Sequence, residues 1–203
     1  MNWQELSALL VLATAMSFTP GPNTTLSAAL AANHGLKRAL PFVCAVPLGW
    51  GLLLALCTLG LGALVLALPL LAGAIKLAGV AYLLWLALKL ARSRQLGEAD
   101  AARLNVTFWQ GAALQFVNIK AWMLALAIVS GWIAGRDEAA LRFALVLPIM
   151  LAFAFASNLT YALAGSLLRH WLRGPAGTGR RLRWFNRAMA AMLAATAVWI
   201  ARS

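Results

Sequence analysis

The sequence predicts an all-α polytopic membrane protein with about six transmembrane helices. Of its 203 residues, 63% are hydrophobic and 11% are charged, whereas soluble domains average about 45–50% apolar and 25% charged residues. A soluble chain of this length has too small an interior to bury that excess. Apolar stretches long enough to span a bilayer, about 20 residues each, recur between short connections. We therefore expect residues 1–203 to form a single transmembrane domain.

Six apolar stretches define the expected helices, at about 6–32, 41–66, 69–90, 108–133, 141–168 and 185–200. The first stretch is expected to remain in the protein, because the five residues before it contain no Lys or Arg, unlike the start of a signal peptide. A turn without charge joins the second and third helices. The sixth helix is only just long enough to span.

The formal net charge is +12, from 17 Lys and Arg against 5 Asp and Glu. On a soluble protein this balance would suggest nucleic acid. Here the basic residues lie in the first, third and fifth connections, where they orient the chain in the lipid bilayer, so no nucleic-acid partner is expected. Connections rich in Lys and Arg stay in the cytoplasm, which places both termini on the periplasmic side of a bacterial inner membrane.

Three helices in each half permit two inverted three-helix repeats, an arrangement in which transporter sites lie near the midplane where helices break. Within the first helix, the run Thr19-Pro20-Gly21-Pro22-Asn23 removes two backbone donors and loosens the helix. Unpaired backbone is tolerated in hydrocarbon only where it is buried in protein or lines a cavity. The sequence therefore favours a functional break over a packing kink, with Pro20, Gly21, Pro22 and Asn23 as candidate substrate-binding residues.

The fourth helix carries a second polar cluster, Gln115, Asn118 and Lys120. Lys120 lies about 12 residues, or roughly 18 Å, from either end of the helix, and a charged Lys at such a depth costs about 2.5–3.5 kcal/mol on insertion scales. In a regular helix Lys120 would point about 200° away from Asn118, so all three residues line one cavity only if the helix is distorted.

Two interpretations of Lys120 follow. It binds the substrate carboxylate, with an added role as proton carrier, or it is a structural lysine buried against helix-end carbonyls. In the fifth helix, Asn158, Thr160 and Tyr161 either line the pathway or form hydrogen bonds between helices.

Other function classes have little support. The expected spans contain no Asp or Glu and no cluster of His and Cys, so we expect neither an enzyme nor a metal or other cofactor. A passive channel or a structural membrane subunit is the alternative to a carrier. The sequence leaves open whether the chain forms a homo-oligomer.

These motifs resemble the LysE/RhtB family of lysine and threonine–homoserine exporters. The resemblance covers nearly the whole chain and is carried by residues 19–23, by the His34-Gly35 turn and by Lys76 with residues 79–83. Asn118-Ile119-Lys120 stands in the place of the family's Asn-Pro-Lys element. Because Ile119 replaces the usual proline, the sharpness of the break in the fourth helix is open.

Residues 82–87, 108–109 and 113–120 look closest to the cysteine and O-acetylserine exporter branch of that family. The resemblance implies a secondary transporter that exports small amino acids or their derivatives from the cytoplasm. The expected energy source is the membrane gradient, most simply that of protons.

Overall fold

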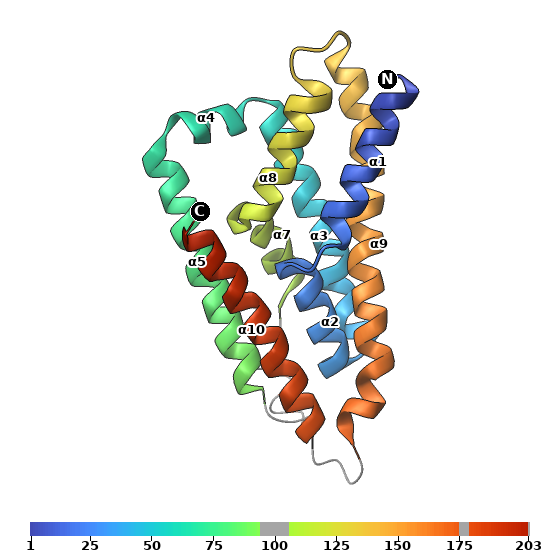
Figure 1. Ribbon diagram of the computed structural model, residues 1–203, viewed down its shortest axis with the longest axis vertical. Coiled ribbons are helices and arrows are strands. Elements are labelled where there is room, and N and C mark those ends of the chain that lie inside the picture. The colour runs from blue at the N-terminus through green and yellow to red at the C-terminus, as the bar shows by residue number, and fades with distance from the viewer. Residues whose placement is uncertain (94–105, 175–178, 203) are drawn as a thin grey trace.

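The computed structural model describes residues 1–93, 106–174 and 179–202, and this part of the chain is built of helices without strands (Figure 1). In chain order the helices are α1 (Trp3–Phe18), α2 (Pro22–His34), α3 (Leu36–Thr58), α4 (Leu61–Ala67), α5 (Pro69–Arg92), α7 (Phe108–Val117), α8 (Ile119–Ile128), a π-helical turn η1 (Val129–Ile133), α9 (Ala139–Arg173) and α10 (Arg180–Arg202). The expected all-α membrane fold is confirmed.

Among the described residues, three helices are long and apolar enough to cross a membrane, namely α3, α5 and α9. A fourth span is formed if α7 and the helix that follows it, which meet at a bend of 69°, are counted together. Helix α1 is apolar but has only 16 residues. The count of six spans and the inverted repeats therefore stay predictions.

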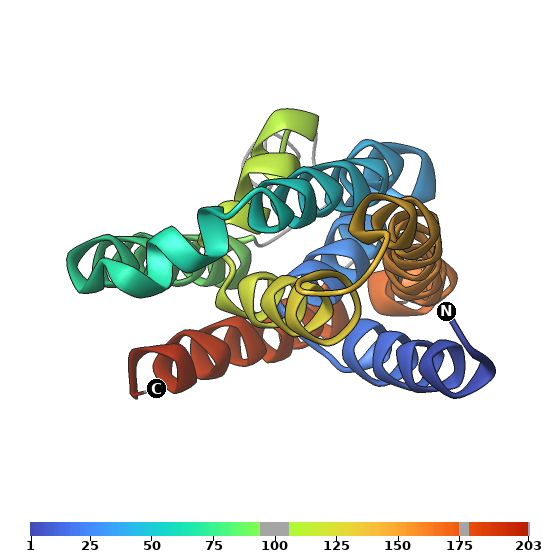
Figure 2. The ribbon, with the colours of Figure 1, turned by 90° about the horizontal axis from the view of Figure 1, so that it is seen from above.

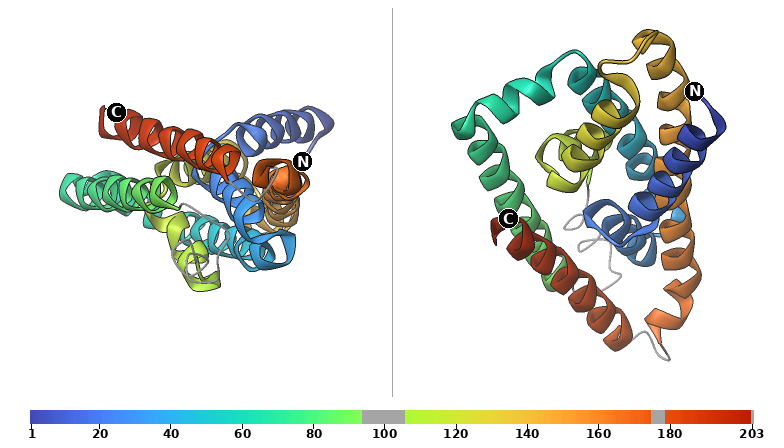
Figure 3. Two further views of the ribbon diagram at one scale, coloured as in Figure 1. Left: turned by 90° about the horizontal axis from the view of Figure 1, so that it is seen from below. Right: turned by 45° about the horizontal axis from the view of Figure 1, so that its top comes forward.

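The second expected helix, 41–66, differs from the structure. Helix α3 begins at Leu36 and stops at Thr58, and the separate helix α4 follows. Gly60 causes the interruption because it adopts a left-handed conformation, with φ 104°, which is a common way to end a helix. Figure 3 shows α4 crossing from α3 to the start of α5.

Two further boundaries are corrected. The sixth helix is 23 residues long, not the 16 residues of 185–200, because it starts within the arginine-rich stretch. The fifth runs through 139–173 instead of 141–168. Much of the basic third connection, at 94–105, and residues 175–178 of the fifth lie outside the described residues.

Helix α2 lies at the centre of the molecule. Its side chains are buried around almost the whole circumference, and it packs against α9, α3 and α10. Gly165 of α9 permits the closest approach, because a Cβ there would overlap the backbone oxygen of Ala28. Buried polar pairs add specificity: Ser27 donates to Asn158 (2.8 Å), and the amides of Asn33 and Asn186 exchange two hydrogen bonds (2.8 and 3.0 Å).

Helix α5 and helix α10 form a second packed pair. Seen from above, the start of α5 and α4 extend away from the bundle that contains α1, α2 and α9 (Figure 2). Accordingly, α5 exposes large apolar side chains such as Leu70 and Leu77, as expected of a helix that faces lipid.

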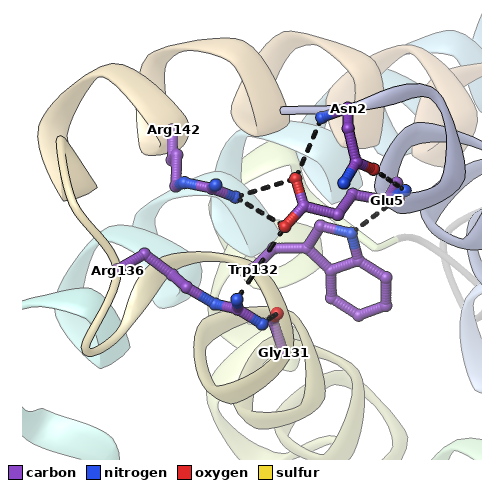
Figure 4. A network of polar contacts seen from close by, with 6 residues as sticks. All are labelled: Asn2, Glu5, Gly131, Trp132, Arg136 and Arg142. Atoms are coloured by element: carbon purple, nitrogen blue, oxygen red, sulfur yellow. Dashed lines mark hydrogen bonds and ion pairs between the residues drawn. The ribbon is translucent and has the colours of Figure 1, made fainter.

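Helix α1 packs far less than α2 and buries only two of its residues, Leu9 and Ala13. Its N-terminal end is held by polar contacts instead (Figure 4). The Glu5 carboxylate accepts from Arg142 at 3.3 Å and lies 3.8 Å from Arg136, while the Trp132 indole donates to the Glu5 carbonyl at 2.9 Å. These contacts tie α1 to η1 and to the start of α9.

Candidate functional site

The break expected in the first helix meets a second break, in the fourth expected helix, inside the bundle. One separates α1 from α2 at residues 19–21, and the other separates α7 from α8 at Asn118. The Lys120 ammonium donates to the Thr19 carbonyl at 2.8 Å. The Asn23 and Gln115 amides exchange hydrogen bonds of 2.9 and 3.1 Å. Each break is therefore positioned by the other.

Local chemistry explains the first break. Thr19 and Gly21 are extended, and Pro22 begins α2, a position that suits proline because the first residues of a helix have no intrahelical acceptor for their N–H. The Gly21 N–H turns forward and donates to the Thr24 hydroxyl at 3.0 Å. The chain thus ends one helix and starts another within three residues.

The second break forms although Ile119 stands where a proline is expected. Asn118 is extended (φ −94°, ψ 100°), and its side chain caps α8 by accepting from the Lys120 N–H at 3.2 Å. The Trp122 indole donates to the Phe116 carbonyl at 2.8 Å, which satisfies one of the acceptors at the end of α7. This sharp bend brings Asn118 and Lys120 to one cavity.

That cavity holds about 520 Å³ of empty space including its opening. Its polar wall combines both breaks with the middle of α9, in particular Asn23, Thr24, Asn118, Lys120, Ser157 and Asn158. Its apolar wall includes Val46, Trp50, Leu124 and Met150. Within the described lining, Lys120 is the one charged residue and there is no carboxylate.

Of the seven candidate residues, five line this cavity: Gly21, Pro22, Asn23, Asn118 and Lys120. Gly21 leaves room for the lysine, because a Cβ there would lie 3.2 Å from Lys120 Cδ. The other two, Pro20 and Gln115, are not part of the described lining.

Gln115 is fully buried behind the cavity wall. Its Nε2 donates to the carbonyl of Gly111 at 3.1 Å as well as to Asn23. Gln115 therefore supports Asn23 from behind. Pro20 acts through its backbone, because it has no N–H with which to continue α1.

The fifth-helix residues divide between the two roles considered for them. Asn158 lines the cavity, and the Tyr161 hydroxyl instead donates to the Phe18 carbonyl at 2.9 Å. Thr160 bonds within its own helix, to Ala156. Ser157 is a lining residue that the sequence analysis missed, although a Ser-Asn pair inside an otherwise apolar span was a usable signal.

A model of the family described as "LysE type translocator" matches residues 14–203. The chain is 31% identical to a cysteine/O-acetylserine efflux protein of Salmonella typhimurium over 169 residues, 83% of this chain and 86% of that protein. It is 30% identical to the proteins of the same name from Escherichia coli K12 and Shigella flexneri, with the same coverage. No solved structure matches the chain.

Proposed function

The chain belongs to the LysE type translocator family, and we propose that it exports small amino acids or their derivatives from the cytoplasm. Candidate substrates are cysteine, O-acetylserine and other neutral amino acids, since relatives at 30–31% identity are named for cysteine and O-acetylserine efflux. The observation that carries the proposal is the meeting of two helix breaks at a cavity whose described lining contains Lys120 and no carboxylate.

The substrate carboxylate is expected to bind Lys120 and the start of α2. Lys120 is half-buried and reaches the cavity beside Gly21. Helix α2 begins there, and the first N–H groups of a helix carry a partial positive charge and have no intrahelical partners. Asn23 and Asn118 add amide groups on either side.

The same lining disfavours cationic substrates. A lysine or arginine substrate would bring a second cation beside Lys120, and no carboxylate in the described lining would compensate it. The apolar wall formed by Val46, Trp50 and Met150 suits a short, uncharged substrate side chain. This selectivity agrees with the names of the relatives.

Export also needs an energy source, and we assign this role to the proton gradient. Lys120 is the titratable group of the described lining, so it would hold the substrate while charged and exchange a proton after release. A carrier must also keep its cavity closed toward one side of the membrane. Helix α2 can provide this closure because it is buried and hydrogen-bonded to α9 and α10.

Overexpression in cells and counterflow in liposomes test the function together. We expect enhanced tolerance to one or a few neutral amino acids, and saturable exchange of labelled cysteine or serine against the unlabelled compound. Lys76→Met is the matched control, because Lys76 lies on α5 and outside the described lining. Unsaturable leak would indicate a channel, and unchanged pools and no exchange for any amino acid would refute export.

The orientation is part of the proposal. With both termini periplasmic, alkaline phosphatase fused after Leu68 or Arg136 should be active, and after Arg92 inactive. A fusion at the C-terminus should be active if α10 spans the membrane. The reverse pattern would overturn the argument from the basic connections.

A further inference from the structure

We propose that, in the empty protein, the ammonium of Lys120 occupies the position that the substrate's own α-ammonium takes during transport. This inference rests on the proposed export function and assigns a second subsite within the same cavity. It makes a free α-amino group a requirement for transport.

The subsite is created by the hydrogen bonds that α1 loses at its end. In a continuous helix, the carbonyls of residues 16–19 would accept from the N–H groups of residues 20–23. Pro20 and Pro22 have no N–H, and the Gly21 N–H is taken by the Thr24 hydroxyl. The break therefore releases a cluster of carbonyl oxygens at one helix end.

Two of these carbonyls are occupied by side chains from distant helices. Tyr161 of α9 donates to Phe18 at 2.9 Å, and Lys120 of α8 donates to Thr19 at 2.8 Å. The tyrosine bond is neutral and lies beyond the described cavity lining, so we regard it as a fixed support. The lysine bond lies in the cavity wall.

The carbonyls of Met16 and Ser17 complete the cluster. Both residues line the cavity with Thr19, and within the described part of the chain neither carbonyl has a hydrogen-bond donor. Backbone acceptors at membrane depth are normally satisfied. Met16 and Ser17 line the same cavity in which the Thr19 carbonyl holds an ammonium, which indicates a site there for a group with several N–H donors.

A primary ammonium fits this site by charge and by geometry. The C-terminal end of a helix carries a partial negative charge, and a primary ammonium offers three donors. The described lining has no carboxylate, and the partially negative helix-end carbonyls can compensate a substrate cation there. Lys120 presents the same chemical group as an α-amino acid.

Binding would then be an exchange of one ammonium for another. The substrate ammonium takes the Thr19 carbonyl, and Lys120 turns to the substrate carboxylate. The α-amino nitrogen and the carboxyl carbon share one Cα and lie about 2.5 Å apart, so a small movement of the lysine suffices. An N-acylated amino acid keeps the carboxylate but has no ammonium, and it cannot displace Lys120 from Thr19.

Competition for counterflow tests this requirement in the wild-type protein. Labelled cysteine exchange in liposomes is measured with S-methylcysteine or its N-acetyl derivative as competitor. We expect the N-acetyl compound to need at least about tenfold higher concentration, as for loss of one charged hydrogen-bonding group. Competition by both compounds at similar concentrations would overturn the inference while leaving amino-acid export intact.

A binding experiment tests the same subsite without transport. Purified Lys120→Ala lacks the ammonium, and propylammonium chloride supplies the missing part of the side chain. We expect propylammonium to raise the melting temperature of this variant by about 2–4 °C and to leave wild type and Lys76→Ala unchanged. Tetramethylammonium, which has the charge without N–H donors, should have no effect.

Each other outcome of the binding experiment counts against the inference. No shift, an equal shift in wild type, or an equal shift with tetramethylammonium would show that no ammonium subsite exists at this helix end. If Lys120→Ala does not fold, the competition experiment on the wild-type protein decides. If no amino acid exchanges, the binding experiment decides, and the failure belongs to the proposed function.

Discussion

Replacement of Lys120 by Met separates an anchoring role from a structural one. Methionine keeps most of the length of the side chain and removes the ammonium with its 2.8 Å bond to the Thr19 carbonyl. If Lys120 binds the substrate carboxylate, the variant should fold and insert but not export. If Lys120 mainly satisfies the end of α1, the variant should be unstable.

Two opposing terms set the size of the effect on stability. Loss of a hydrogen bond to a charged group costs about 1.5–3 kcal/mol. Removal of a lysine charge at membrane depth returns about 2.5–3.5 kcal/mol on insertion scales. The terms nearly cancel, and the free energy of unfolding should change by about 1 kcal/mol or less.

The assay compares protein in the membrane, melting temperature and counterflow for Lys120→Met and Lys76→Met. We expect matched amounts and melting temperatures, with exchange lost in the first variant alone. Lys120→Arg should bind substrate weakly and turn over slowly, because a planar guanidinium does not reproduce the geometry of an ammonium. Export by Lys120→Met above about half the wild-type rate, at matched protein levels, would refute the anchor role; failure to insert would assign Lys120 to structure.

Three further variants address the helix breaks and the packing around them. Pro20→Ala with Pro22→Ala returns two N–H donors to the end of α1, so protein amounts should stay normal while counterflow is lost; retained exchange would reduce the motif to packing. Gln115→Leu removes the support of the first break and should raise the KM for counterflow and lower stability by about 1–3 kcal/mol, and an unchanged KM would contradict that role. Gly165→Ala places a methyl group against the backbone of α2 and should lower the melting temperature by several degrees. The control is Gly131→Ala, because nothing lies within 4 Å of the added Cβ. Equal melting temperatures for the two variants would show that the close contact between α2 and α9 does not contribute to stability.

The second break shows where inference from sequence was incomplete. Polar residues deep in an apolar stretch pointed to a distortion there, but Ile119 gave no reason for a sharp bend. The structure provides one through the Asn118 side chain, which caps α8, and through the Trp122 indole, which covers a carbonyl of α7. Capping by asparagine depends on how the backbone already turns, so the residue type alone could not predict it.

Gln115 illustrates a different limit. Its depth and polarity made it a candidate binding residue, yet it lies fully buried and holds Asn23 from behind. Helical spacing can place a residue on a face. It cannot distinguish a side chain that lines a cavity from one that supports the lining, because that depends on the neighbouring helix.

Composition and local chemistry were enough to determine the membrane class, the break at Pro20 to Pro22 and the presence of a lysine in the middle of an apolar segment. Each depends on residues that are adjacent in the chain or on averages over it. Tertiary structure alone decided that Lys120 reaches Thr19 and that Asn33 pairs with Asn186, across 101 and 153 positions of sequence. Such contacts arise from the packing of several helices at once, because the angle and depth at which each helix meets its neighbours select which of its polar groups face one another.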